Sequence, residues 1–467
     1  MRKINKLLLL AFIVIISSCS PDYTKIIKEP EKKFYNGQPV EAARVFIPHI
    51  NKKNKDQLLF LMEAGLMLHT ADEFTKSAEV FSKAGHVAAT ISTSLTKQAA
   101  SLFLNEKSTN YKGEDFERVL IHMYLGINYL MVKNPESARV EFKKVNDELN
   151  RINQQSGKQY RQNIMAKYLT AIAYEMIGDM DNDQEAWEYA YVEYKQIYGL
   201  QPGLALVYRD LERISAKLKY TDDYRQWLRK FGKKDAIPAG AGELIVIYQA
   251  GRSAIKQSRG PLMSDKAMAG AIQVAIGSMS FEAGVTIAAI TATLRNAEHP
   301  IPKFVKRSNR IQKLNIVING RTEGSTIMLE DIENTAVKTL RDDYSRIYKK
   351  VAAGIVTKVA ASIATGIAAK KIAEQADNAY IKAASGCIGI AAGAGTGAAL
   401  MSQIKPDLRC WHSLPANLQL ERIFLKPGKY TLTLQFIDKN GAVVRTETDE
   451  VEVTGGGKTF VNYRTLY

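Results

Sequence analysis

The sequence predicts an α+β multidomain protein, with an N-terminal solenoid of paired helices followed by a mostly antiparallel sheet domain that carries long helical insertions. Residues 23–235 show the apolar periodicity of successive amphipathic helices. Past residue 235 turn residues and alternating strands replace that periodicity, which places a domain boundary between residues 235 and 236. A chain of 467 residues, 46% hydrophobic and 24% charged, has room for two to three folded domains.

Residues 1–18 have the composition of a secretory signal peptide. A basic start precedes an apolar run at 7–16, which is shorter than the roughly 20 residues of a spanning helix. The order Ile16-Ser17-Ser18-Cys19 resembles the lipobox of bacterial lipoproteins, which implies cleavage before Cys19 and acyl chains such as palmitate on Cys19. Several acyl chains anchor a protein stably to a membrane. An ordinary secreted protein is the alternative.

Location and charge limit the partners that we expect. Ser20 stands where proteobacterial lipoproteins retained in the inner membrane carry Asp, which favours the periplasmic face of the outer membrane. The net charge of +16 suggests acidic neighbours such as anionic lipid or cell-wall polymer. Export makes nucleic acid an unexpected partner.

The cysteine and histidine pattern predicts no metal or cofactor. Apart from Cys19 the chain has only Cys387 and Cys410, which could pair in an oxidising compartment if they meet. The six histidines are scattered without metal-ligand spacing.

Residues 23–235 contain small and aromatic residues at the offsets of a 34-residue helical hairpin. Small residues let two helices approach, and aromatic residues fill the groove between successive hairpins. The segment therefore resembles a tetratricopeptide array of about four imperfect units, with degenerate hairpins of no named family as the alternative. The matching positions are Gly37, Ala42 and Phe46, then Gly65, Leu68, Asp72, Ser77, Phe81 and Ala84, then Gly126, Tyr129, Ala138 and Phe142, and finally Ala171, Tyr174, Ala190, Tyr194, Ile197 and Pro202.

Tetratricopeptide arrays offer a concave surface to peptides or protein partners. By this analogy we predict that Tyr129, Phe142, Tyr174 and Tyr194 contact a protein partner.

Several strands are predicted in the C-terminal part. Residues 243–249 form a continuous apolar run typical of a buried strand, and residues 311–318 alternate. Asn319-Gly320 predicts a type I′ turn before a strand at 326–329, and Asn440-Gly441 turns the strand at 430–436 back toward 443–453. Residues 459–463 form a final strand.

A helical hairpin is predicted at about 331–403. Its first helix runs from near Asp331 past residue 369, and its partner at 383–403 has no charge. The partner contains Gly389, Gly393 and Gly397, a doubled GxxxG pattern that lets helix backbones come close. The hairpin either packs on its own domain, or inserts into a membrane or oligomerises. Residues 267–294 are a third weakly polar stretch.

A basic run without acidic residues precedes the strand at 311–318. It is a solvated edge or a contact with lipid head groups or cell-wall polymer, and it consists of Lys303, Lys306, Arg307, Arg310 and Lys313.

No catalytic residue is predicted. The glycine-rich run at 455–459 lacks the first glycine of a phosphate loop and leads into a strand, so we interpret it as a hairpin turn. In Cys410-Trp411-His412, adjacent side chains of an extended chain point to opposite faces, which favours Trp411 as a core anchor over a cysteine nucleophile.

The whole chain resembles an uncharacterised family of conserved bacterial lipoproteins with tetratricopeptide-like N-termini. The resemblance lies in the lipobox, the repeats, residues 244–248 (LIVIY), residues 329–332 (LEDI) and the closing run at 409–430. The family has no agreed activity, so no functional residues transfer. Its members often have Asp-Thr-Arg-Ser-Trp where this chain has residues 407–411 (DLRCW), which implies that Cys410 is neither catalytic nor part of an obligatory disulfide.

The leading functional hypothesis is a non-enzymatic, lipid-anchored envelope scaffold that recruits a periplasmic protein through its repeats. The alternative is a membrane-active or oligomerising component of an envelope secretion or assembly apparatus that uses the glycine-rich hairpin. A cell-wall polymer binder is a second alternative. No small-molecule substrate is predicted.

Overall fold

The computed structural model describes residues 23–95, 109–156, 160, 162–232, 236–277, 294, 297–401 and 405–466. Cys19 and the predicted signal peptide lie outside the described residues, as does most of the weakly polar stretch at 267–294.

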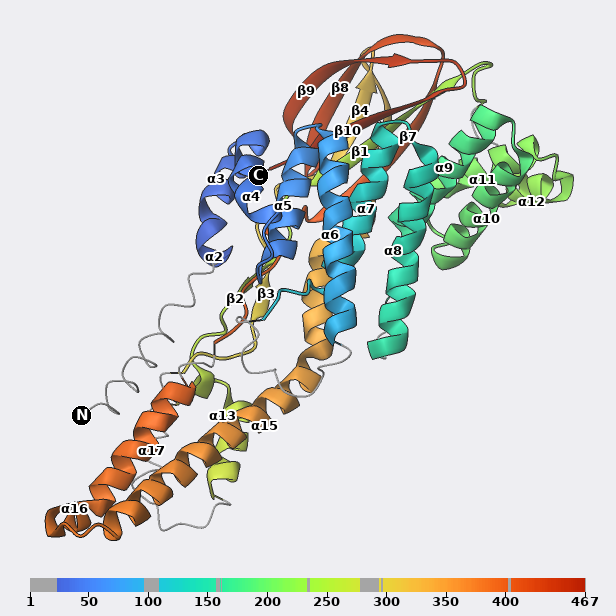
Figure 1. Cartoon of the computed structure of the whole chain (residues 1–467). Helices are drawn as coiled ribbons and strands as arrows, with labels where there is room; N and C mark the ends of the chain where they lie inside the picture. Colours follow the sequence, from blue (N-terminus) through green and yellow to red (C-terminus); the bar gives the residue numbers. More distant parts are fainter. Residues whose placement is uncertain are drawn as a thin grey trace.

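Within these residues the N-terminal part is an array of five consecutive helix pairs, preceded by the single turn α2 (Tyr23–Ile26) (Figure 1). The array was predicted, with one pair fewer. The pairs are α3 (Lys28–Tyr35) with α4 (Pro39–Ile50), α5 (Gln57–Thr70) with α6 (Phe74–Leu95), α7 (Asp115–Met131) with α8 (Pro135–Ser156), α9 (Ile164–Asp181) with α10 (Gln184–Leu200), and α11 (Leu206–Lys217) with α12 (Thr221–Phe231).

The turn inside each pair contains one residue in the left-handed backbone region. This conformation ends the first helix and lets the second helix fold back along it. These five equivalent turns show where each repeat begins and ends. The spacing of the apolar residues is too uneven to show this. The φ angles are 79°, 58°, 57°, 52° and 58° at Gly37, Asp72, Lys133, Asn182 and Lys219.

Glycine allows three of these pairs to close tightly, and in α9 with α10 the contact is between Gly178 and the ring of Trp187. A Cβ added at Gly65 of α5 would lie 2.9 Å from the ring of Phe81 in α6. One added at Gly126 of α7 would lie 2.5 Å from the ring of Phe142 in α8. The glycine–aromatic contacts that the repeat spacing predicts are therefore formed.

Two four-stranded sheets form the C-terminal part (Figure 1). All neighbouring strands in them are antiparallel except the parallel pair β1 and β10. The first sheet has the order β10 (Lys458–Arg464), β1 (Gly242–Ala250), β7 (Asn417–Leu425) and β6 (Ile327–Asp331). The second has the order β5 (Arg321–Ser325), β4 (Ile311–Ile318), β8 (Gly428–Asp438) and β9 (Val443–Val453), and β2 (Ile255–Gln257) pairs separately with β3 (Lys303–Val305).

Strand β1 is buried on both faces, which explains its unbroken apolar sequence. Leu244 and Val246 pack into a core between the two sheets. Ile245 and Ile247 belong to the core of the helix array. One apolar core therefore crosses the predicted boundary at residues 235/236, which separates helices from strands but does not separate two independent cores.

Two turns connect different strands from those predicted. Asn319 and Gly320 have φ angles of 49° and 83°, as a type I′ turn requires, but they lead into β5. The strand predicted at 326–329 is β6 in the other sheet, so the chain crosses between the sheets at Thr326. The glycine turn at 455–457 likewise joins β9 to β10 in the other sheet and closes no hairpin.

A long helical hairpin, called the arm below, extends away from the array and sheets (Figure 1). It consists of α15 (Ile332–Glu374), the short α16 (Ala379–Ala383) and α17 (Ser385–Met401), and α13 (Lys266–Gly277) packs beside α15. The Asp331 side chain caps α15 by accepting a hydrogen bond from the backbone N–H of Asn334 at 3.0 Å. The predicted start of this helix is confirmed.

Candidate interaction surfaces and a pocket at the root of the arm

The inner face of the array, formed by α5, α7 and α9, is covered by the C-terminal part of the chain itself. Every residue at 165–178 of α9 is buried, whereas α10 buries a single stripe. The first sheet and the segment at 405–416 lie on this inner face. The concave surface that we expected to receive a partner is therefore occupied within the chain.

The segment at 405–416 is held by buried carboxylates of the array. The backbone N–H of Trp411 donates to Glu117 at 2.7 Å, and that of His412 donates to Glu63 at 2.7 Å. The Trp411 ring lies 5.8 Å from the Phe81 ring and is buried. Trp411 is thus a core anchor, as its place in the sequence indicated.

Burial gives these carboxyls unusual protonation behaviour. It raises the pKa of Glu117 to about 7, with the negative charge of Glu114 adding to the effect and a hydrogen bond from Tyr111 opposing it. Burial also raises the pKa of Glu63. The sequence signal for this arrangement is a single acidic residue within an otherwise apolar stretch of helix, as Glu63 is in α5.

A second polar contact between array and sheet centres on Arg422 of β7. Its guanidinium pairs with Glu175 of α9 and Asp210 of α11 at 2.9 Å each, and with Glu243 of β1 at 2.5 Å. Burial opposes ionisation of Glu175, but Arg213 and Arg422 outweigh it and hold the Glu175 pKa well below its usual value. The three carboxylates compensate a cation that burial alone would disfavour.

The four aromatic residues predicted to contact a partner lie inside the array. Phe142 and Tyr194 are fully buried, and Tyr174 is nearly so. Tyr129 is partly buried against the same core. The Tyr194 hydroxyl donates to Glu175 at 2.6 Å. Phe142, Tyr174 and Tyr194 therefore pack the repeats together and are not available to a partner, whereas Tyr129 keeps part of its side chain exposed.

The basic run does not form one continuous patch. Arg307 points inward, pairs with Glu31 of α3 at 3.2 Å and donates to the carbonyl of His412 at 2.7 Å. Lys306 lies 3.7 Å from Glu333. Lys303, Arg310 and Lys313 are exposed. Arg307 is therefore a structural link between the array and the sheets, while the other four residues of the run, Lys306 included, are exposed.

The glycines of α17 pack against α15 within the arm. A Cβ at Gly389 would lie 2.8 Å from the carbonyl oxygen of Gly366, and one at Gly366 would lie 3.3 Å from Cα of Gly393. Gly397 is buried two turns beyond Gly389 on the same stripe. Residues 347–374 of α15 form a segment long and apolar enough to cross a membrane. In its most apolar stretch of 18 residues, 39% is buried.

The structure brings together no metal or disulfide site among its described residues. Cys387 is exposed and Cys410 is buried, and both are free thiols. Within the described ranges no three His, Cys, Asp or Glu side chains gather as metal ligands.

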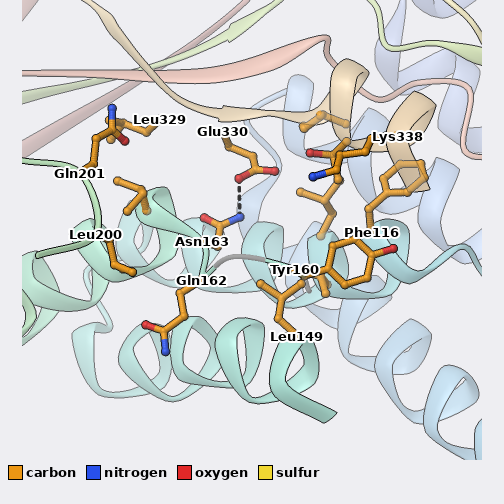
Figure 2. A pocket seen from close by; sticks show the side chains of 15 residues that line it. Phe116, Leu149, Tyr160, Gln162, Asn163, Leu200, Gln201, Leu329, Glu330 and Lys338 are labelled. Carbon is orange, nitrogen blue, oxygen red and sulfur yellow. Dashed lines mark hydrogen bonds between the residues drawn. The ribbon is translucent and has the colours of Figure 1, made fainter. Parts of the chain in front are cut away.

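A pocket of about 320 Å³ lies where α15 leaves the array and the sheets, and Figure 2 shows its lining. Apolar walls come from α7, α8 and the start of α15, including Phe116, Leu120 and Leu149. Glu330, at the end of β6, points into this space and accepts a hydrogen bond from the Asn163 side-chain amide at 2.6 Å. Burial, with a smaller contribution from the neighbouring charge of Asp331, raises the pKa of Glu330 to about 7, and the hydrogen bond from Asn163 opposes this rise.

Comparison with known proteins adds limited information. No protein-family model and no curated protein matches this sequence. Among solved structures, the chain is similar to MamA from Desulfovibrio magneticus RS-1, at 14% identity over 46% of this chain and 93% of that one, with a TM-score of 0.30. It is also similar to the nearly identical TPR-like repeats of a kinesin light chain from Podosopora anserina, at 11% identity over 44% of this chain and 91% of that one, with a TM-score of 0.30. The helix pairs are tetratricopeptide-like by their own glycine–aromatic contacts.

Proposed function

We propose that this protein is a non-enzymatic scaffold of the bacterial cell envelope, anchored by lipid on Cys19, that holds a protein partner on its outer surface. The observation that carries the proposal is the closed inner face of the array, because a partner must then bind elsewhere. The lipobox supports the anchor. In the described residues the buried charged groups are engaged in structural contacts, and no nucleophile with its base and orienting group is assembled.

The outer face of the fourth helix pair is the surface that we assign to the partner. Tyr189 and Val192 lie one turn apart on α10, and each is 46% exposed. Exposed apolar side chains that lie next to each other mark a candidate contact site for a protein partner. A protein partner suits this surface because its residues are aromatic and aliphatic.

Crosslinking in intact cells tests this assignment. We expect the Tyr189→Glu/Val192→Glu double variant to lose a crosslinked protein that the wild type captures, with no change in thermal stability. The matched control is Val140→Glu, which places a charge at an equally exposed position of α8. Deletion of residues 23–235 is unsuitable because the array and the first sheet share a core. A partner that binds the double variant as well as the wild type would refute this surface.

The lipid anchor is tested separately. Labelled palmitate should enter the wild type and should not enter Cys19→Ala, which we expect to leave the membrane fraction. Labelling of the alanine variant would refute the assignment of Cys19.

A second candidate function is contact of the arm with a bilayer, and the apolar length of residues 347–374 favours it. Ile372 and Tyr380 near the tip of the arm are 71% and 88% exposed. Carbonate extraction of the Cys19→Ala variant separates the candidates. Protein retained in the membrane supports insertion of the arm, whereas complete release supports the scaffold alone.

A further inference from the structure

The pocket at the root of the arm has the size and composition of a small-molecule site. Its volume of about 320 Å³ lies at the lower end of the range for such sites, roughly 300–1,000 Å³. Its walls are mostly apolar, and Phe116, Leu120 and Leu149 are each less than a tenth exposed. No local sequence pattern indicates this pocket, because its walls come from segments far apart in the chain.

Glu330 is the polar group that decides what this pocket can hold. Among the described residues its carboxylate accepts one hydrogen bond, from Asn163, and no Lys or Arg forms an ion pair with it. Lys338 also lines the pocket, but its side chain is exposed. The pocket lining thus combines apolar side chains with polar ones, and the partly buried Glu330 carboxylate has a single hydrogen-bond donor and no ion pair to Lys338. A ligand that brings a cation would complete its pairing.

We propose that this pocket binds an apolar ligand that carries a primary ammonium group. The ammonium pairs with the Glu330 carboxylate, and the apolar part lies against Phe116, Leu120 and Leu149. An anionic ligand would be repelled by Glu330. A purely apolar ligand would leave the carboxylate buried and unpaired.

Binding at this position would also hold the arm. The first turns of α15 line the pocket through Ile332 and Thr335, and the wall opposite belongs to α7 and α8. The Tyr160 hydroxyl already donates to Thr339 of α15 at 3.0 Å. A ligand between these surfaces would add contacts between the array and the base of the arm, so hydrogen exchange in the first turns of α15 should slow.

Calorimetric titration of the full chain with n-octylammonium tests the proposal, with 1-octanol and octanoate as controls of equal length. At pH 8 we expect n-octylammonium to bind at least about tenfold more tightly than either control. Glu330→Gln keeps the hydrogen bond with Asn163 and removes the charge, and it should weaken n-octylammonium binding about tenfold. The matched control Glu323→Gln changes an exposed carboxylate of β5 and should have no effect.

The pH dependence of the wild type provides a test that needs no variant. Because the pKa of Glu330 is about 7, its carboxyl is mostly protonated at pH 5.5, and the preference for n-octylammonium over 1-octanol should shrink. Equal binding of these two ligands at pH 8, or tight binding to Glu330→Gln, would overturn the proposal.

The ammonium group could come from a free amine or from an aminolipid head group. Dihexanoyl phosphatidylethanolamine, with dihexanoyl phosphatidylcholine as its control, distinguishes them. Displacement of n-octylammonium by the former alone assigns the head group, and displacement by neither assigns a free amine.

Discussion

The inner helices of the array and the arm are both rich in apolar residues, yet they are used in opposite ways. Residues 165–178 of α9 are all buried, whereas only 39% of the most apolar window of α15 is buried. The inner helices mix large side chains with single acidic residues whose partners come from the segment at 405–416 and from the first sheet. The arm relies on small residues, and its two helices pack on each other through glycine backbones.

We call the array together with the two four-stranded sheets the body. The body is stabilised by long-range contacts, whereas the arm is stabilised mainly by local ones. The body is tied by contacts between residues hundreds of positions apart, such as the hydrogen bond from His412 to Glu63. Beyond its first turns, where Ile332 and Ala336 belong to the core of the array, the arm is held by α13 and by its own hairpin. Damage to the body should therefore lower the stability of the whole chain, while damage within the arm should stay in the arm.

The largest effect is expected at Arg422. Arg422→Ala removes the cation that Glu175, Asp210 and Glu243 share. Arg213 and Lys458 still pair with these carboxylates, so the free energy of unfolding should fall by about 3 kcal/mol, the lower end of the range for a broken buried ion pair. Urea denaturation of the full chain measures it. Arg445→Ala removes an exposed guanidinium of β9 and should cost under about 0.5 kcal/mol. Equal losses in the two variants would mean that the array and sheet are not locked through this cluster.

A smaller effect, visible in acid, is expected at His69. Its Nδ1 donates to Asn128 and its Nε2 accepts from Gln249 of β1, so the neutral ring joins α5 to the first sheet. Burial lowers its pKa from 6.5 to about 4. The unfolded chain therefore takes up the proton first, and the contribution of His69 is complete above pH 6.5 and declines by ~3 kcal/mol as the pH falls toward 4.

The difference in unfolding free energy between wild type and His69→Gln, followed from pH 8 to pH 4, isolates this contribution from that of the buried glutamates. This difference in unfolding free energy should become smaller as the pH falls. His86→Gln alters an exposed ring on α6 and should show a constant gap near zero. A gap between wild type and His69→Gln that does not change with pH would contradict the assigned neutral ring.

The smallest effect on the body is expected from the arm. Gly389→Val would push a side chain into the backbone of Gly366, so α15 and α17 should separate. We expect faster proteolysis within residues 332–401 and little change in the melting of the body. Gly386→Val, where a Cβ meets nothing within 4 Å, is the matched control. A fall of several degrees in the melting temperature of the body for Gly389→Val would show that the stability of the body depends on the arm and would contradict this prediction.

Local patterns in the sequence predicted the elements better than their assembly. The spacing of Gly65 and Phe81 predicted a helix pair because that contact is formed within one hairpin. The run at 243–249 predicted a buried strand, since both of its faces are covered. The fifth pair, α11 with α12, was missed because its helices are short and its register depends on the turn at Lys219.

Long-range contacts account for what the sequence could not predict. Periodicity marked Phe142 and Tyr194 as members of the repeat but could not distinguish inner packing from outer surface. Arg307 was assigned to a basic surface because its partner, Glu31, lies 276 positions earlier in the chain. The pocket around Glu330 has no local signature, because helices and strands from both halves form it.

The threading of the segment at 405–416 through the array has a consequence for biosynthesis. Glu63 and the amide that it binds are 349 residues apart, so at roughly 5–20 residues per second the array waits tens of seconds for its last component. During that interval the apolar inner helices and their carboxylates face solvent. The array can therefore complete its inner contacts only after the C-terminal residues have been made.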